Sequence, residues 1–233
     1  MTRLANYSDD AGNRIVHGGA IENGIRIKFV GSNNLLVVSD LARLGQLTID
    51  FDCDNGVVQI GASKGVPAFS AAIRVGQDSR VLIGDDVSCT ETVAMSATEG
   101  TTIRVGDDVM FASLNQVRAD DGHPIFDVRT EKRVNVSRSI TIGNHVWVGR
   151  GAAVLGGATI GDGTVIGYGS IVTRAIPNNC VAAGVPAKVV RRDTAWERPH
   201  LSMAKPYYKP DASTVKKSRY WRLTDDEGEG AAS

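Results

Sequence analysis

The sequence predicts an all-β protein whose chain winds into a parallel β-solenoid with a protruding loop and an irregular C-terminal tail. Three observations support this fold class: aliphatic residues recur every six positions, a glycine follows most of them, and two polar segments lack the period. A period of six fits neither an α-helix nor a simple alternating strand. Fixed internal repeats of this kind are typical of stacked-coil proteins.

The repeat is clearest in the C-terminal half of the chain. An aliphatic residue occupies every sixth position from Ile142 to Val172, and glycine follows in four of the six hexads. We expect the aliphatic side chain to point inward, the glycine to ease a corner, and three hexads to close a triangular turn of 18 residues. The Ile-Gly pairs that start at Ile142 and Ile160 are 18 residues apart, as this geometry requires.

The period is looser towards the N-terminus. Related motifs begin at Ile60, Ile83 and Val105, at steps of 23 and 22 residues, so each coil there carries a small insertion. Residues 1–56 contain strand-like runs between Gly and Asn turns. We interpret them as irregular N-terminal coils of the same solenoid, with a separate small β domain as the alternative. The hexapeptide-repeat β-helix is expected over residues 57–190.

Two segments cannot continue the apolar repeat. Residues 118–139 are polar, so we expect them to leave the coil as a loop, and long loops on a rigid scaffold usually carry function. The C-terminal tail, residues 191–233, has no period. We expect a short helix over 193–198 and disorder over 225–233.

Composition excludes several classes of function. The formal net charge is zero, so no basic field points to nucleic acid or an anionic membrane. No run of 18 apolar residues is present, and the N-terminus lacks the apolar segment of a signal peptide. The three cysteines are far apart and show no CxxC spacing: Cys53, Cys89 and Cys180. We interpret them as buried small hydrophobic residues in a reducing cytoplasm, and so predict a cytoplasmic protein.

Residues 142–191, which begin IGNHVWVGRGAAVLGGATIGDG, resemble the left-handed β-helix acyltransferases with hexapeptide repeats. The segment is similar to galactoside, maltose and virginiamycin acetyltransferases and to sugar O-acetyltransferases of polysaccharide gene clusters. The resemblance covers about half the chain and is the sole source of the left-handed winding, since parallel crossovers are otherwise right-handed. It implies a homotrimer with sites between subunits, acetyl-CoA as co-substrate, and no metal.

The resemblance also assigns individual residues. His123, in Gly122-His123-Pro124, matches the catalytic histidine of the family, and Trp147 matches a tryptophan near the active site. Further positions correspond to residues that contact the cofactor in the family: Arg150, Tyr168, Thr173, Lys188 and Arg191. Arg150 and Tyr168 depart from the galactoside enzyme, which has serine and alanine there. Lys188 and Arg191 are expected to meet the CoA phosphates, with simple surface charge as the alternative.

Acetyl transfer to a hydroxyl needs a base, and a neutral imidazole near pH 7 suits that role. We therefore expect His123 to act as general base in a direct transfer without a covalent enzyme intermediate. Asp121 or Asp127 is expected to hold the other ring nitrogen, although either is equally expected to cap its own turn. The backbone N–H groups of residues 149–151 are expected to bind the oxyanion, which adds Gly151 to the cofactor-binding set.

The predicted function is acetyl-CoA-dependent O-acetylation of a sugar or polysaccharide precursor. An amino-sugar N-acetyltransferase and a non-catalytic solenoid scaffold remain alternatives on the same fold. A zinc enzyme of the γ-carbonic anhydrase type is disfavoured, since only two of the four histidines lie in the relevant region. His145, next to a predicted corner, is expected to be an outward polar residue. No motif encodes the acceptor or the donor chain length.

Overall fold

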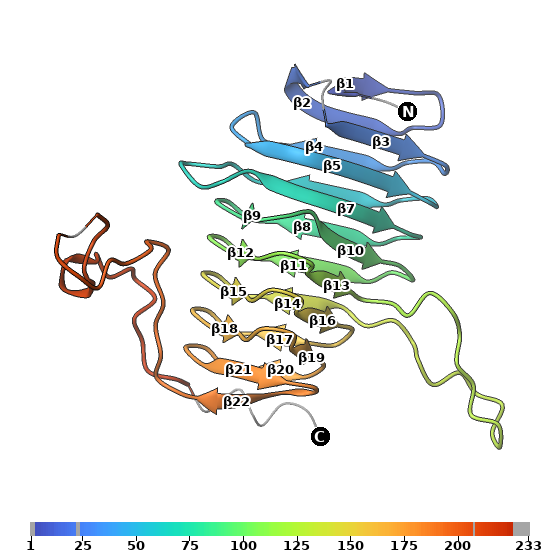
Figure 1. Ribbon diagram of the computed structural model, residues 1–233. Helices are drawn as coiled ribbons and strands as arrows, with labels where there is room; N and C mark the ends of the chain where they lie inside the picture. Colours follow the sequence, from blue (N-terminus) through green and yellow to red (C-terminus); the bar gives the residue numbers. More distant parts are fainter. Residues whose placement is uncertain (1–2, 22–23, 207, 226–233) are drawn as a thin grey trace.

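The computed structural model describes residues 3–21, 24–206 and 208–225 (Figure 1). The chain winds through three β-sheets that stack as the faces of a prism, with a loop and a tail projecting from opposite sides. This confirms the predicted all-β parallel solenoid with a protruding loop and a C-terminal tail. The described part contains one short 3₁₀ helix, η1 (Ala212–Thr214), and no helix in it is long and apolar enough to cross a bilayer.

Sheet B has nine strands, in this order: β1 (Leu4–Ser8), β2 (Arg14–Ile21), β4 (Leu35–Val38), β6 (Val57–Ile60), β8 (Arg80–Ile83), β11 (Thr102–Val105), β14 (Ile140–Ile142), β17 (Thr159–Ile160) and β20 (Ala175–Ile176). Sheet A has seven: β3 (Ile25–Phe29), β5 (Leu44–Phe51), β7 (Phe69–Val75), β10 (Val93–Ala97), β13 (Gln116–Arg118), β16 (Ala153–Leu155) and β19 (Ile171–Val172). Sheet C has six: β9 (Ser88–Cys89), β12 (Met110–Phe111), β15 (Trp147–Val148), β18 (Val165–Ile166), β21 (Val181–Gly184) and β22 (Ala187–Arg191).

Neighbouring strands pair in parallel except at the two ends of the stack. There β1 is antiparallel to β2, and β22 is antiparallel to β21. The strands before residue 57 belong to the same sheets as the later ones, because β4 pairs with β6 and β5 pairs with β7. Sheet C begins only at β9, so the first coils have two strands per turn and the later coils have three.

The register agrees with the sequence period. Leu35 pairs with Val57 in the looser coils, a step of 22 residues, and Ile142 pairs with Ile160 in the regular coils, a step of 18. The inward row of aliphatic residues is fully enclosed; Val148, Val154 and Ile166 all have an exposed fraction of 0%. Burial of each such side chain contributes roughly 1.5–3 kcal/mol, so the narrow core holds the stack together.

A ladder of Asp and Asn side chains runs down the corner between sheets B and C. In each step a side-chain oxygen of one coil accepts the backbone N–H of the coil before it, at 2.7–2.9 Å. We call these residues the Asx ladder: Asp85, Asp107, Asn144 and Asp162. They are the third residues of the repeated Ile-Gly-Asx motif, so the ladder explains why that motif recurs at this corner.

The residue after each ladder position has a left-handed backbone. Asp86, Asp108 and His145 take φ values of 56°, 58° and 52°. Asp tolerates this region better than most residues, because its short side chain hydrogen-bonds locally. His145 therefore occupies a place that Asp holds in the two preceding coils. Its ring stacks against Trp196 and Tyr220 of the tail rather than pointing to solvent.

The structure corrects two further expectations. Residues 193–198 form no helix, because Thr194 and Trp196 use backbone groups to bind the solenoid. Cys53 is exposed, whereas Cys89 and Cys180 are buried as predicted. Cys53 follows β5 at a turn that leaves this residue exposed to solvent. Of the segment expected to be disordered, residues 226–233 lie outside the described residues.

The Asx ladder generates a test of the corner. A Cβ atom at Gly106 would lie 2.7 Å from Asn144 Oδ1 and 2.8 Å from the Gly143 carbonyl carbon. We expect Gly106→Ala to lower the free energy of unfolding by about 1–3 kcal/mol, since neither neighbour has room to move. Urea unfolding at fixed protein concentration measures this. Gly19→Ala, at an exposed position of β2 where the nearest atom to the added Cβ is His17 Nε2 at 3.3 Å, is the matched control and should change stability by less than ~0.5 kcal/mol. Equal losses in the two variants would contradict the crowding.

Candidate active site

The protruding loop spans residues 119–139 and leaves the solenoid between β13 and β14, at the corner between sheets A and B (Figure 1). It folds back on itself as an irregular hairpin: Phe126 bridges Arg133, and Val134 N–H donates to the Ile125 carbonyl. His123 is exposed on its outgoing arm. Among the described residues, no side chain hydrogen-bonds to the His123 imidazole.

Asn135, on the returning arm, holds the His123 segment in place. Its Nδ2 donates to the His123 carbonyl at 2.8 Å and to Asp121 Oδ2 at 2.9 Å. Its Oδ1 accepts the Ile125 N–H at 2.7 Å. One amide side chain thus holds the backbone from the His123 carbonyl to Ile125 and connects this segment to the Asp121 carboxylate. Sequence analysis missed Asn135, because an Asn in a polar loop carries no distinguishing signal.

Asp127 is a turn residue. Its Oδ1 accepts the N–H groups of Thr130 and Arg129, at 2.7 and 2.9 Å, and the Thr130 hydroxyl at 3.0 Å. These hydrogen bonds, first that from the Thr130 N–H, hold the pKa of Asp127 below its usual range. This carboxylate is therefore committed to its own turn, whereas Asp121 is joined to the His123 segment through Asn135.

An ion pair ties the loop to the solenoid. Arg133 grips Glu99 with two nitrogens, at 2.6 and 3.0 Å, and the Ser137 hydroxyl donates to Glu99 Oε2 at 2.6 Å. The Arg133 hydrogen bond is the main reason that the pKa of Glu99 falls to about 2. Glu99 follows β10, so the anchor lies at the foot of the loop.

A polar cavity of about 340 Å³ lies beside this anchor, and Gly122 and Pro124 on either side of His123 line it. Buried Asp120 also lines it. Its Oδ2 accepts the Ser96 hydroxyl at 2.5 Å, and its Oδ1 lies 3.8 Å from Arg74 and makes no hydrogen bond. None of the residues predicted for the site lines this cavity.

The predicted cofactor residues lie mainly on or next to sheet C. The outward row of this sheet pairs Trp147 with Val165, Val165 with Val181, and Val181 with Arg191. Adjacent strands are ~4.8 Å apart, so the row runs about 14 Å from Trp147 to Arg191. Trp147 is 39% exposed and Arg191 is exposed, which leaves an accessible track with an indole at one end and a cation at the other.

Three more of the predicted residues meet at the corner between sheets C and A. Arg150 and Gly151 follow β15, and Tyr168 follows β18 one coil later. The Arg150 carbonyl accepts the Gly169 N–H at 2.9 Å, which stacks the two corners directly. Tyr168 is 78% exposed, so its ring is available to a ligand. Lys188 is exposed on β22, whereas Thr173 follows β19 at the far corner and does not join this group.

The expected oxyanion role of the 149–151 amides is wrong for both glycines. The Gly149 N–H donates to the Ile166 carbonyl at 2.8 Å, and the Gly151 N–H donates to the Ser113 carbonyl at 2.9 Å. These donors hold neighbouring coils together and are not free for a ligand. Gly151 has a φ of 70°, so its established role is to turn the corner.

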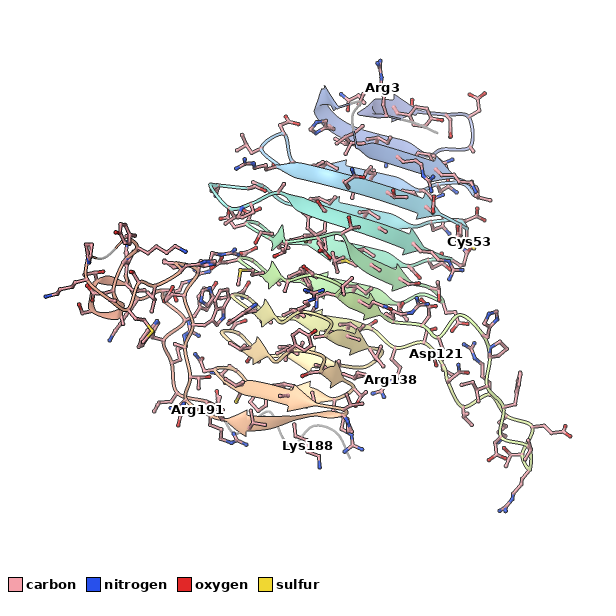
Figure 2. All side chains as sticks on the ribbon, viewed as in Figure 1. Arg3, Cys53, Asp121, Arg138, Lys188 and Arg191 are labelled. Carbon is pink, nitrogen blue, oxygen red and sulfur yellow. The ribbon has the colours of Figure 1, made fainter. Side chains whose placement is uncertain are left out.

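The structure does not bring His123 and Trp147 together within one chain. The loop projects from one side of the prism, whereas β15 lies on the opposite side (Figure 1). In Figure 2, Asp121 and Arg191 likewise lie on opposite sides. Within one chain, His123 and the outward row of sheet C therefore do not form a single site.

His145 is the clearest error among the sequence expectations for this region. The residue is only 2% exposed, with Nδ1 2.6 Å from Asp108 Oδ2 and Nε2 2.9 Å from the Trp196 carbonyl oxygen. The sequence did indicate that His145 lies at a corner, because it directly follows Asn144 of the Asx ladder. It did not indicate that the side chain is buried. No local signal pointed to Trp196, which lies 51 residues further along the chain. In the described part, no three His, Cys, Asp or Glu side chains are grouped so that they can hold a metal ion.

Residues 139–174 match the family described as bacterial transferase hexapeptide (six repeats). A polysialic acid O-acetyltransferase of Escherichia coli O1:K1 / APEC is 46% identical over 101 residues, which is 43% of this chain and 33% of that protein. The match therefore spans about a third of that relative. The crystal structure of the polySia-specific acetyltransferase NeuO is similar with a TM-score of 0.74 and 36% identity, over 80% of this chain and 85% of NeuO. The polysialic acid O-acetyltransferase OatWY shares the fold, with a TM-score of 0.65 and 23% identity over 83% and 92%.

The loop anchor generates a prediction. We expect Glu99→Gln to increase the rate of proteolytic cleavage in residues 119–139 several-fold at pH 7, because a neutral amide holds the Arg133 guanidinium much less strongly. The lowered pKa of Glu99 sets the pH range over which its ion pair with Arg133 holds the loop. The stabilisation is fully present above the usual Glu value of 4.5 and is lost as the pH falls through about 2. Timed digestion with mass spectrometry measures the effect. Glu131→Gln, at the exposed loop tip, is the matched control; equal acceleration in both variants would refute the anchor.

Proposed function

The chain belongs to the bacterial hexapeptide-repeat acetyltransferases, and we propose that it transfers the acetyl group of acetyl-CoA to a hydroxyl group of a sugar or polysaccharide precursor. The similarity to NeuO over most of both chains is the observation that carries this proposal. Because the E. coli relative and NeuO are both named for polysialic acid, this polymer is the first acceptor to test. The donor is a cytoplasmic metabolite, so we expect the reaction to take place in the cytoplasm.

In the proposed mechanism His123 takes the proton of the acceptor hydroxyl. The hydroxyl oxygen attacks the thioester carbonyl carbon, and the tetrahedral intermediate collapses with cleavage of the C–S bond. The imidazolium then protonates the departing CoA thiolate, so no covalent enzyme intermediate is needed. The exposed, unbonded imidazole supports this role, since a general base must reach its substrate. Asp121 is proposed to orient the ring, supported by the Asn135 link between the two residues.

The cofactor is proposed to lie along the outward row of sheet C, with its thioester towards Trp147 and its phosphates towards Arg191 and Lys188. The length of the row and the cation at its end support this placement. Arg150, Gly151 and Tyr168 flank the row at the neighbouring corner. Thr173 does not face this row. It is a proposed contact only if a second subunit presents it to the cofactor from the opposite wall of the site.

We propose that the enzyme is a homotrimer whose active sites lie between subunits. The loop of one chain would bring His123 to the cofactor row of the next, which explains why one chain keeps them apart. Apolar side chains on the loop support a protein partner, because large hydrophobic groups rarely stay in water on a projecting arm. Five are more than half exposed: Ile125, Phe126, Val128, Val134 and Val136.

The general-base role is tested by His123→Ala. We expect the turnover number for CoA release with polysialic acid or another sugar acceptor to fall about 10²–10⁴-fold, since that is the usual contribution of a positioned base. Release is followed with a thiol reagent, and the acetylated product by mass spectrometry. His200→Ala, an exposed histidine in the tail, should keep full activity. An unchanged rate in His123→Ala sinks the mechanism, and acetylation of amines alone would favour the N-acetyltransferase alternative.

The cofactor row is tested by Arg191→Ala. A hydrogen bond between a charged donor and a phosphate contributes about 1.5–3 kcal/mol, so we expect the Kd for CoA to rise roughly tenfold or more. Calorimetry with CoA and with dephospho-CoA shows whether the 3′-phosphate is the group involved. Arg174→Ala, an exposed arginine between sheets A and B, is the matched control and should bind as the wild type does. Equal Kd values for all three proteins would remove Arg191 from the site.

A further inference from the structure

His145 is a buried histidine to which the proposed reaction assigns no role. Its Nδ1 faces an Asp108 oxygen at 2.6 Å, and its Nε2 faces the Trp196 carbonyl oxygen at 2.9 Å. Asp108 is itself held as an anion, because Arg198 Nε donates to its other oxygen at 2.6 Å. A carboxylate and a carbonyl oxygen only accept hydrogen bonds, so both ring nitrogens must donate. Only the doubly protonated imidazolium satisfies this arrangement.

The surroundings of the ring favour a positive charge. His145 lies between two aromatic rings, with centroid distances of 4.2 Å to Trp196 and 4.8 Å to Tyr220 and interplanar angles of 14° and 4°. Aromatic faces attract a cation, and more strongly when water is excluded. The charged groups around this stack are two acids and two arginines: Asp108, Glu197, Arg198 and Arg219.

This stack fastens the tail to the solenoid. Trp196 Nε1 donates to the His145 carbonyl at 2.8 Å, so the two residues exchange hydrogen bonds in both directions. Arg198 extends the contact by donating to Asp108 and, at 2.8 Å, to the Ser88 hydroxyl. We call residues 194–198 the strap. Trp196 within it is only 8% exposed.

The strap also ends the open row of sheet C. By register the row continues upward from Trp147 to Met110 and then to Ser88. Ser88 is only 2% exposed, because Arg198 lies over it. The indoles of Trp196 and Trp147 touch, with a centroid distance of 5.9 Å and an angle of 45°. The strap therefore covers the outward row of sheet C at Ser88 and packs against one side of the Trp147 ring.

We propose that a buried imidazolium at His145 locks the strap onto the solenoid, and that Trp196 is thereby a positioning residue for Trp147 at the closed end of the acetyl-CoA track. The second half rests on the proposed function, which is what places acetyl-CoA on this row. Burial alone lowers the pKa of His145, but the hydrogen bonds to Asp108 and to the Trp196 carbonyl, with the charge of Asp108, outweigh it, and the net pKa is raised. A raised pKa means that the lock is complete below the usual His value of about 6.5 and is lost as the pH rises through the folded-state value.

The charge state is tested first, by NMR of the full-length wild type with labelled histidine. Four histidine signals are expected, and the one absent from His145→Gln is that of His145. We expect this signal to keep the imidazolium shift at pH 7.5, a full unit above the usual His value of about 6.5. A neutral His145 at that pH overturns the proposal.

The positioning role is tested with His145→Gln, whose amide donates at one end only and so leaves either Asp108 or the Trp196 carbonyl unpaired. We expect at least tenfold faster tryptic cleavage at Lys216 or Lys217, a shift of the Trp147 signal in ¹⁹F NMR of fluorotryptophan-labelled protein, and a threefold to tenfold higher KM for acetyl-CoA with kcat within twofold. His200→Gln is the matched control and should match the wild type throughout. Faster tail cleavage with an unmoved Trp147 signal and an unchanged KM overturns the positioning role.

Trp196→Phe leaves the tryptic sites of the tail unchanged and keeps an aromatic face, but it removes the Nε1 donor. This variant is used if His145→Gln does not fold. It should move the Trp147 signal and raise the KM in the same direction by a smaller factor; no change in either overturns the proposal. Failure of the proposed function is recognised separately. In that case the wild type transfers no acetyl group. The histidine titration, the tail cleavage and the ¹⁹F signal still test whether the His145 imidazolium holds the strap on the solenoid.

Discussion

The requirement that each coil return to hydrogen-bonding distance of the previous one governs this structure. Parallel strands must lie about 4.8 Å apart, so every corner has to be compact enough to stack on its neighbour. At the corner between sheets B and C, glycine supplies the close approach and the Asx ladder supplies acceptors for backbone N–H groups that the turn would leave unpaired. The six-residue period in the sequence is the consequence of this spacing repeated along three faces.

The same constraint decides where the chain can depart from the repeat. Additional residues cannot enter a strand without breaking its register, so they leave at corners. The loop of residues 119–139 leaves between β13 and β14, and the tail leaves after β22 and returns along the corner that carries His145. The rigid stack therefore fixes the outward row of sheet C, and the two departures are the loop that carries His123 and the tail that covers His145. The proposed reaction joins them by placing the loop of one chain against the track of another.

The fold was predictable to a large extent because its cause is local and repeated. The strand-like runs expected within residues 1–56 include β3 (Ile25–Phe29), and the 18-residue step at Ile142 matches the observed register. The contacts of the tail were not predictable, since Trp196 meets His145 across 51 residues and no repeat marks either partner. The helix expected over 193–198 failed for the same reason: its backbone groups find partners on the solenoid. The oxyanion role of Gly149 and Gly151 failed because stacking already uses their N–H groups.

The reversed strands at the two ends of the stack have a consequence for the protein in a crowded solution. A parallel coil presents its whole cross-section as a template, so a stack with bare ends invites further copies to add end to end into a fibre. Because β1 and β22 run against their neighbours, they do not offer the direction of pairing that another coil would need to extend the winding. One sheet at each end of the stack is thus closed to parallel extension: sheet B by β1 at the N-terminal end and sheet C by β22 at the C-terminal end.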